Sequence, residues 1–242
     1  MNELIKQLYD RKSVRAFTDD PIDEAIVQEI LCSSAMAPTA GNQQMYTIIR
    51  VTDQTLIDRL AESCDHQPFI AKGKLVLVYC ADCLKWYEAF KQAGCSPRDP
   101  GPGDLLLAVD DALIAAQNAV VAAESYGIGS CYIGDIMENI ETQRDILGLP
   151  DYVFPAAMLV FGWPTRQQKD REKPQRIDMK HLVFENRYPD MDAERLRDMM
   201  SKGKSPEEYE RWMKAFCERK YNSGFAREMS RSVREYLKQF KG

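Results

Sequence analysis

Three cations and a hydroxyl lie close together near the start of this 242-residue chain, at Arg11, Lys12, Ser13 and Arg15. A guanidinium matches phosphate oxygens in a two-pronged geometry, and a lysine adds a point charge. A second cationic pair of the same kind lies far along the chain, at Lys173 and Arg176. Together the two regions predict a phosphate-binding site. Solvated basic turns are the alternative reading of the same residues.

The chain lacks several motifs that mark other chemistries. It contains no G-x-G-x-x-G, no G-x-x-x-x-G-K-[ST], no H-E-x-x-H and no G-x-S-x-G sequence. It has only two histidines, His66 and His181. Hydrolysis built on imidazole is therefore disfavoured, and chemistry supplied by a bound cofactor is the simpler hypothesis.

Cysteine usage indicates a reducing compartment and no metal site. The seven cysteines are odd in number and scattered, which fits the cytoplasm better than a disulfide framework. Cys80 and Cys83 form a lone C-x-x-C without a second ligand pair, so we expect no zinc and place both thiols at the end of a strand.

The charge balance gives no reason to expect a polyanionic partner. A formal charge of −5 argues against nucleic acid and against an anionic membrane surface. The most apolar stretch, 105–123, contains Asp110 and Asp111, which are costly in a bilayer, so we expect a helix buried in protein. The last residues, 190–242, carry a local charge of +3, which leaves −8 for the rest, and this shift indicates a helical appendage.

Periodicity and turn residues predict an alternation of helices and strands without a regular βαβ repeat. Helices are expected from about residue 20 to 37, over 105–126 and over 140–147. Strands are expected over 46–51, 74–80, 131–133 and 155–161. An irregular or partly helical excursion is expected between 83 and 104. The class is therefore α+β or mixed α/β.

Five segments, taken in order, resemble the FMN-dependent nitroreductase family. They are RKSVRAF at 11–17 followed by Thr18 and Asp19, PTAGNQQ at 38–44, AAESYGIGSCYIG at 122–134, Gly162-Trp163-Pro164, and K-P-x-R at 173–176. The resemblance covers about residues 1–188 and is closest to the NADPH-preferring, oxygen-insensitive nitroreductases and NADPH-flavin oxidoreductases.

The resemblance implies a fold and a domain organisation. We expect the α+β, nitroreductase-like three-layer fold, in which helices flank a central mixed and mainly antiparallel sheet. Residues 1–188 would form the FMN-binding core. Residues 189–242 would form a charged helical extension that wraps the partner subunit of a homodimer with FMN at the interface. The alternative for the alanine-rich helix at 105–126 is the centre of its own monomer.

The resemblance also assigns residues to the cofactor. The FMN phosphate is expected at the two cationic regions named above. The isoalloxazine ring is expected against the loop after the first long helix and against Gln67. The segment 132–134 is expected to lie along the flavin, with the backbone amide of Gly134 near N5. The residues implied as FMN contacts are Arg11, Lys12, Ser13, Arg15, Pro38, Thr39, Asn42, Gln67, Tyr132, Ile133, Gly134, Lys173 and Arg176.

The implied activity is hydride transfer from NADPH or NADH, through bound FMN, to a nitroaromatic, quinone or flavin acceptor by a ping-pong mechanism. No side chain acts as a nucleophile in such a reaction. Two alternatives remain open from the sequence. One keeps the flavin but changes the reaction to reductive dehalogenation or flavin fragmentation. The other is a flavin-binding or thiol-based redox regulator that uses Cys80 and Cys83.

Overall fold

The computed structural model describes residues 1–242 and divides them into two compact units. The first unit comprises Met1–Arg171 and Glu228–Gly242, and the second comprises Glu172–Arg227. The first unit ends at Arg171, before the sequence-based boundary at residue 188. It also includes the last fifteen residues of the chain, since Tyr236 and Phe240 are buried in its core.

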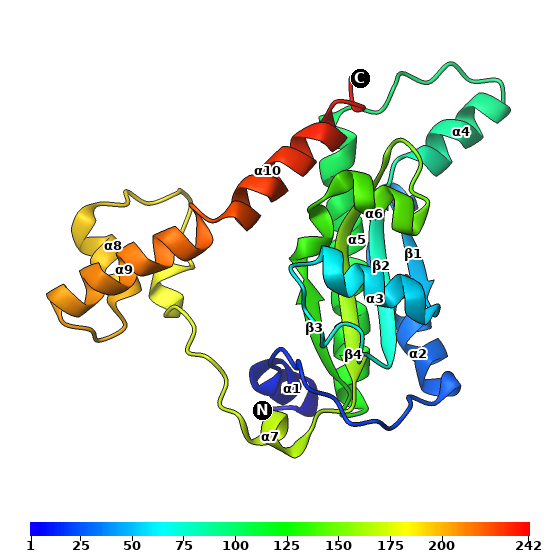
Figure 1. The fold of residues 1–242 in the computed structure, drawn as a ribbon. Coiled ribbons are helices and arrows are strands. Elements are labelled where there is room, and N and C mark those ends of the chain that lie inside the picture. The colour runs from blue at the N-terminus through cyan, green and yellow to red at the C-terminus, as the bar shows by residue number, and fades with distance from the viewer. The chain divides into compact units, whose positions relative to one another are not determined.

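A four-stranded antiparallel sheet forms the centre of the first unit (Figure 1). The strand order is β1-β2-β4-β3, with bounds Tyr46–Val51 for β1, Leu75–Asp82 for β2, Gly129–Ile133 for β3 and Val153–Gly162 for β4. The two central strands, β2 and β4, are buried along their whole length, as expected for apolar runs covered on both faces. The strands predicted from the sequence are confirmed.

Helices cover both faces of the sheet and produce three layers. Alternate residues of β2 point to opposite faces. One set packs with α2 (Glu24–Ala35) and α5 (Pro102–Ser125), and the other set packs with α3 (Gln54–Ser63) and α6 (Ile140–Leu147). In Figure 1, α3 and α6 lie in front of the strands and α5 lies behind them. The predicted α+β three-layer fold is confirmed.

The remaining elements of the first unit are short. They are α1 (Glu3–Asp10), the 3-10 turns η1 (Ala40–Asn42) and η2 (Gly134–Met137), α4 (Leu84–Gln92), α7 (Arg166–Asp170) and most of α10 (Gly224–Leu237). The excursion predicted between 83 and 104 is α4 followed by an irregular segment. The predicted helix at 140–147 is α6 with identical bounds.

The alanine-rich helix α5 packs against all four strands. All of its alanines except Ala122 are fully buried, and larger apolar side chains on its other side are exposed: Leu106, Leu107, Leu113 and Ile114. By length and composition, α5 is the one helix that is apolar enough to cross a membrane. Core helices of globular proteins pass the same test, and α5 occupies such a position.

The second unit contains the 3-10 turn η3 (Met179–His181), α8 (Ala193–Ser201) and α9 (Pro206–Lys220). None of its residues is buried. Its helices are held by local polar contacts, such as the capping box of Ser205 and Glu208 at the start of α9. A unit of this kind has no hydrophobic core of its own.

Candidate flavin site

The N-terminal basic segment lies along the edge strand β3. Ser13 forms a parallel bridge with Ser130, and the Val14 amide donates to the Ser130 carbonyl at 2.9 Å. Glycine at 129 permits this approach, because a Cβ there would lie 2.5 Å from a methyl group of Val14. The sequence 11–17 is therefore held in an extended form beside the sheet, as a strand partner would be.

The cations of this segment have different partners. The Lys12 ammonium donates to the Lys169 carbonyl at 2.7 Å and also to the Arg171 carbonyl, so it caps the end of α7. Arg171 in turn donates to the Ser13 carbonyl at 2.5 Å. By contrast, the Nε of Arg11 is buried without a hydrogen-bond partner. A buried, unpaired guanidinium N–H is costly unless it meets an acceptor, so Arg11 fits an anionic ligand such as a phosphate.

Two neighbouring residues of β3, Ser130 and Cys131, show that this edge has a second unpaired polar group and lies close to positive charge. The hydroxyl of Ser130 is also buried without a partner. Burial raises the pKa of the neighbouring Cys131 thiol, while the nearby guanidinium groups of Arg15 and Arg11 act in the opposite direction. Both arginines therefore place positive charge beside β3.

At the end of β3, the turn η2 begins at Gly134. A Cβ at Gly134 would meet only the terminal carbon of Met137, at 4.0 Å, so the space beside this backbone is open. Gln67 lies next to the turn: its amide donates to the Cys64 carbonyl at 2.8 Å and to Asp135 at 3.1 Å. The structure therefore brings Gln67 and Gly134 to the same end of β3.

Tyr132 and Ile133 point to opposite faces of the sheet, as neighbours in a strand must. The Tyr132 hydroxyl lies 3.4 Å from Gln117 of α5, and burial raises its pKa to about 12. Ile133 is buried in the layer of α3 and α6. Ile133 is thus held within the core, whereas Tyr132 is half-buried.

A buried carboxyl group lies at the far end of η2. Glu138 is 4% exposed, and one of its oxygens has no hydrogen-bond partner. Burial raises its pKa to about 7, and the negative charges of Asp135 and Asp65 add to the effect. This residue was not singled out in the sequence, where it is one glutamate among many.

The loop that carries Pro38, Thr39 and Asn42 is held by one buried carboxylate of α5. Asp111 accepts hydrogen bonds from the Thr39 hydroxyl, from the Ala40 amide at 3.0 Å and from the Met45 amide at 3.0 Å. Asp111 is 3% exposed. In the sequence, Asp111 is distinguished only as a carboxylate within the alanine-rich helix. Thr39 therefore shapes the loop, while Pro38 and Asn42 are exposed.

The two groups of expected flavin contacts lie at opposite edges of the sheet. The loop 38–45 leads into β1, one edge strand, whereas the basic segment, Gln67 and Gly134 border β3, the other. Two central strands lie between them, a backbone separation of about 14 Å. Within one copy of the chain, these two groups of residues therefore lie apart.

Lys173 and Arg176 belong to the second unit. There Arg176 borders a hollow of about 380 Å³ together with Lys180, Lys202 and His181. Lys180 and His181 both contact Asp198, at 3.0 and 3.3 Å. Of the second cationic region, Arg176 thus shares a hollow with the contacts that Lys180 and His181 make to Asp198.

The thiols of the C-x-x-C sequence are buried. Cys80 lies in β2 and Cys83 directly precedes α4. Burial raises the pKa of each to about 12, which suppresses the reactive thiolate. All seven cysteines are free.

Comparisons with known proteins agree with this architecture. The family model described as "Nitroreductase family" matches residues 8–163. The oxygen-insensitive NADPH nitroreductase of Salmonella typhimurium is 32% identical over 196 residues, 81% of this chain and 79% of that protein. The FMN reductase [NAD(P)H] of Bacillus subtilis is 29% identical over 228 residues, 90% of each. The solved structure of B. megaterium NfrA2 has a TM-score of 0.85 at 27% identity and covers 100% of this chain and 99% of that one. The chain described here belongs to the nitroreductase family.

Proposed function

We propose that this protein is an NAD(P)H-dependent FMN oxidoreductase that reduces nitroaromatic, quinone or flavin acceptors by a ping-pong mechanism. The observation that carries the proposal is the edge of β3, which carries the basic segment with a buried, unpaired Arg11 N–H and, where the strand ends, the open backbone of Gly134. The names of relatives at 29–32% identity support the same activity.

Each residue of this edge would have a distinct task towards FMN. Arg11, Ser13 and Arg15 would bind the phosphate, and Lys12 would keep the segment in place through the end of α7. FMN, when bound, supplies the hydride-accepting and hydride-donating ring. The Gly134 amide would donate a hydrogen bond where charge develops on that ring. Gln67 would hold the turn and border the ring through its position beside Asp135.

We further propose a homodimer in which each flavin lies between two copies. The two groups of residues at opposite edges of one sheet would be half-sites, joined when β3 of one copy faces the loop 38–45 of the other. Exposed leucines and isoleucines on α5 and α1 supply an apolar surface for such a contact. Lys173 and Arg176 would complete the phosphate site, with residues 1–188 as the flavin-binding core. The extension at 189–242, much of it without buried residues, would gain packing against the partner.

Free thiols throughout the chain support a reducing, cytoplasmic setting. The burial of Cys80 and Cys83 opposes a thiol-based regulator, and no observation favours dehalogenation or flavin fragmentation. The electron donor is expected to be NADPH or NADH.

The test is anaerobic reduction of the FMN-loaded protein by each nucleotide in turn, followed by addition of a quinone or nitroaromatic acceptor. Bleaching of the yellow colour by NADPH or NADH and its return with the acceptor is the expected result. A purified protein that stays colourless after incubation with FMN would overturn the proposal.

A further inference from the structure

The helix α6 begins without a cap of its own. Asn139, the residue before it, adopts a left-handed conformation with φ of 50°. Its side chain turns away from the helix and donates to the Ser63 carbonyl at 2.9 Å. The first amides of a helix need acceptors from elsewhere when the preceding side chain supplies none.

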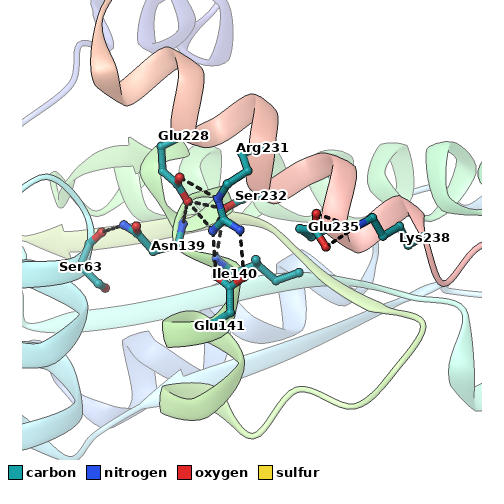
Figure 2. A network of polar contacts seen from close by, with 9 residues as sticks. All are labelled: Ser63, Asn139, Ile140, Glu141, Glu228, Arg231, Ser232, Glu235 and Lys238. Carbon is teal, nitrogen blue, oxygen red and sulfur yellow. Dashed lines mark hydrogen bonds and ion pairs between the residues drawn. The ribbon is translucent and has the colours of Figure 1, made fainter.

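The C-terminal helix α10 supplies these acceptors (Figure 2). The Asn139 amide donates to the Glu228 carboxylate at 3.1 Å, and the Ile140 amide donates to the Ser232 hydroxyl at 3.1 Å. The Ser232 hydroxyl itself donates to Glu228 at 2.8 Å. Two residues one turn apart on α10 therefore cap a helix that lies some ninety residues earlier in the chain.

A single guanidinium holds this arrangement together. Arg231 donates to both oxygens of Glu228 at 2.8 Å and to both oxygens of Glu141 at 2.9 and 2.8 Å. Hydrogen bonding from Arg231 lowers the pKa of Glu228 to about 2, so the cap is a carboxylate at any working pH. A negative charge at a helix N-terminus also interacts favourably with the helix dipole.

The rest of α10 fixes this cap relative to the sheet. Tyr236 is 1% exposed, and its ring packs edge-on against Phe154 of β4 with centroids 4.8 Å apart. Gln239 accepts from the Tyr152 amide at 3.1 Å. Glu228 and Ser232 are thus presented by a helix that is anchored in the core.

The capped residues directly follow the turn of the candidate flavin site. Gly134–Met137 forms η2, Glu138 follows it, and Asn139 is the next residue. The turn is held at its start by Gln67, which bonds Asp135, and at its end by Glu228, which bonds the Asn139 amide. The two hydrogen bonds thus hold residues 135 and 139 of the segment that directly follows Gly134.

We infer that Glu228 and Ser232 are positioning residues for the flavin-binding turn: by capping α6, the C-terminal helix sets where the Gly134 amide points. The inference rests on the proposed function, because the turn matters for catalysis only if FMN binds there. It assigns to residues 228–232 a role that does not require contact with the flavin.

The test compares Glu228→Gln and Ser232→Ala with Glu235→Gln in the full chain. Glu235 is a matched control, because it lies on the same helix and its carboxylate pairs only with Lys238, at 2.7 Å. Hydrogen exchange of the flavin-free protein is measured over residues 134–141. Both test variants are expected to exchange about tenfold faster there, whereas the control is unchanged.

FMN binding and the midpoint potential of bound FMN provide the second readout. With a misplaced Gly134 amide, Glu228→Gln should bind FMN about tenfold more weakly and shift the potential to a more negative value. Ser232→Ala, which removes only a hydroxyl, serves if Glu228→Gln does not fold. Faster exchange confined to Asn139 and Ile140, with residues 134–138 and the potential unchanged, would overturn the inference. Failure of the unaltered protein to bind FMN would instead overturn the proposed function. The exchange data would still show whether the cap from α10 controls the turn 134–138.

Discussion

At the scale of single residues, Glu138 shows how burial sets the response to pH. Its pKa is raised from 4.5 to about 7, chiefly by burial, so the folded protein binds a proton that the unfolded chain has lost. Glu138 therefore costs the fold nothing by ionisation below about pH 4.5, and the stability of the folded protein falls as the pH rises from about 4.5 to about 7.

Glu138→Gln should remove this dependence. The variant is expected to be more stable than the unaltered protein at pH 8 and equal to it near pH 4.5. Urea unfolding at several pH values measures the difference. Glu210→Gln, at an exposed position, is the control, and a parallel shift in both variants would contradict the explanation.

Arg11 is the residue at which the phosphate prediction is most directly tested. Because its Nε is buried without a partner, Arg11→Gln should leave folding intact or improve it slightly while weakening FMN binding by about 2 kcal/mol, the scale of a charge-assisted hydrogen bond. Fluorescence titration with FMN measures the loss. Lys6→Gln, on an exposed lysine of α1, should have no effect on FMN binding. An equal loss of FMN affinity in the two variants would show that the overall positive charge, and not Arg11 itself, binds FMN.

At the scale of elements, α5 organises a loop that is remote from it in sequence. Asp111 accepts three hydrogen bonds from residues 39–45, so Asp111→Ala leaves the buried Met45 amide and the half-buried Ala40 amide without their acceptor. We expect a loss of about 2 to 4 kcal/mol in unfolding free energy, with faster hydrogen exchange in the loop. Asp110→Ala, at the exposed neighbouring position, is the matched control. An equal change in the two variants would show that helix propensity, not the loop, is responsible.

At the scale of the whole molecule, the exposed apolar side of α5 bears on assembly. Leu106 is 66% exposed and Ile114 is 40% exposed, and a charge at either position would be costly within an apolar interface. Leu106→Glu combined with Ile114→Glu is expected to halve the mass measured by light scattering and to abolish tight FMN binding, because the two half-sites would part. Thr55→Glu, exposed on α3, should leave the mass unchanged. A double variant that keeps both its mass and its FMN would show that the dimer forms elsewhere.

Many of the helices and strands could be predicted from local patterns in the sequence. The apolar run of β2 and the periodic sequence of α6 can be recognised without the structure, because propensity and periodicity are properties of neighbouring residues. The end of the chain was less accessible. Residues 228–242 carry the same charged composition as the preceding segment, yet Tyr236 and Phe240 return them to the core of the first unit. Their partners, Phe154 and Tyr152, lie more than eighty residues away.

Residue types and order alone determined the class of fold, the basic segment at 11–15 and the resemblance to a family, since each depends on short stretches of chain. Only the tertiary structure decided that Arg11 has an unpaired N–H, that Asp111 holds the loop 38–45, and that α10 caps α6. It also decided that the loop 38–45 and the basic segment 11–15 lie at opposite edges of one sheet. The physical reason is the same in each case: burial and hydrogen bonding between distant segments depend on which surfaces the folded chain brings together, and no local pattern records that choice.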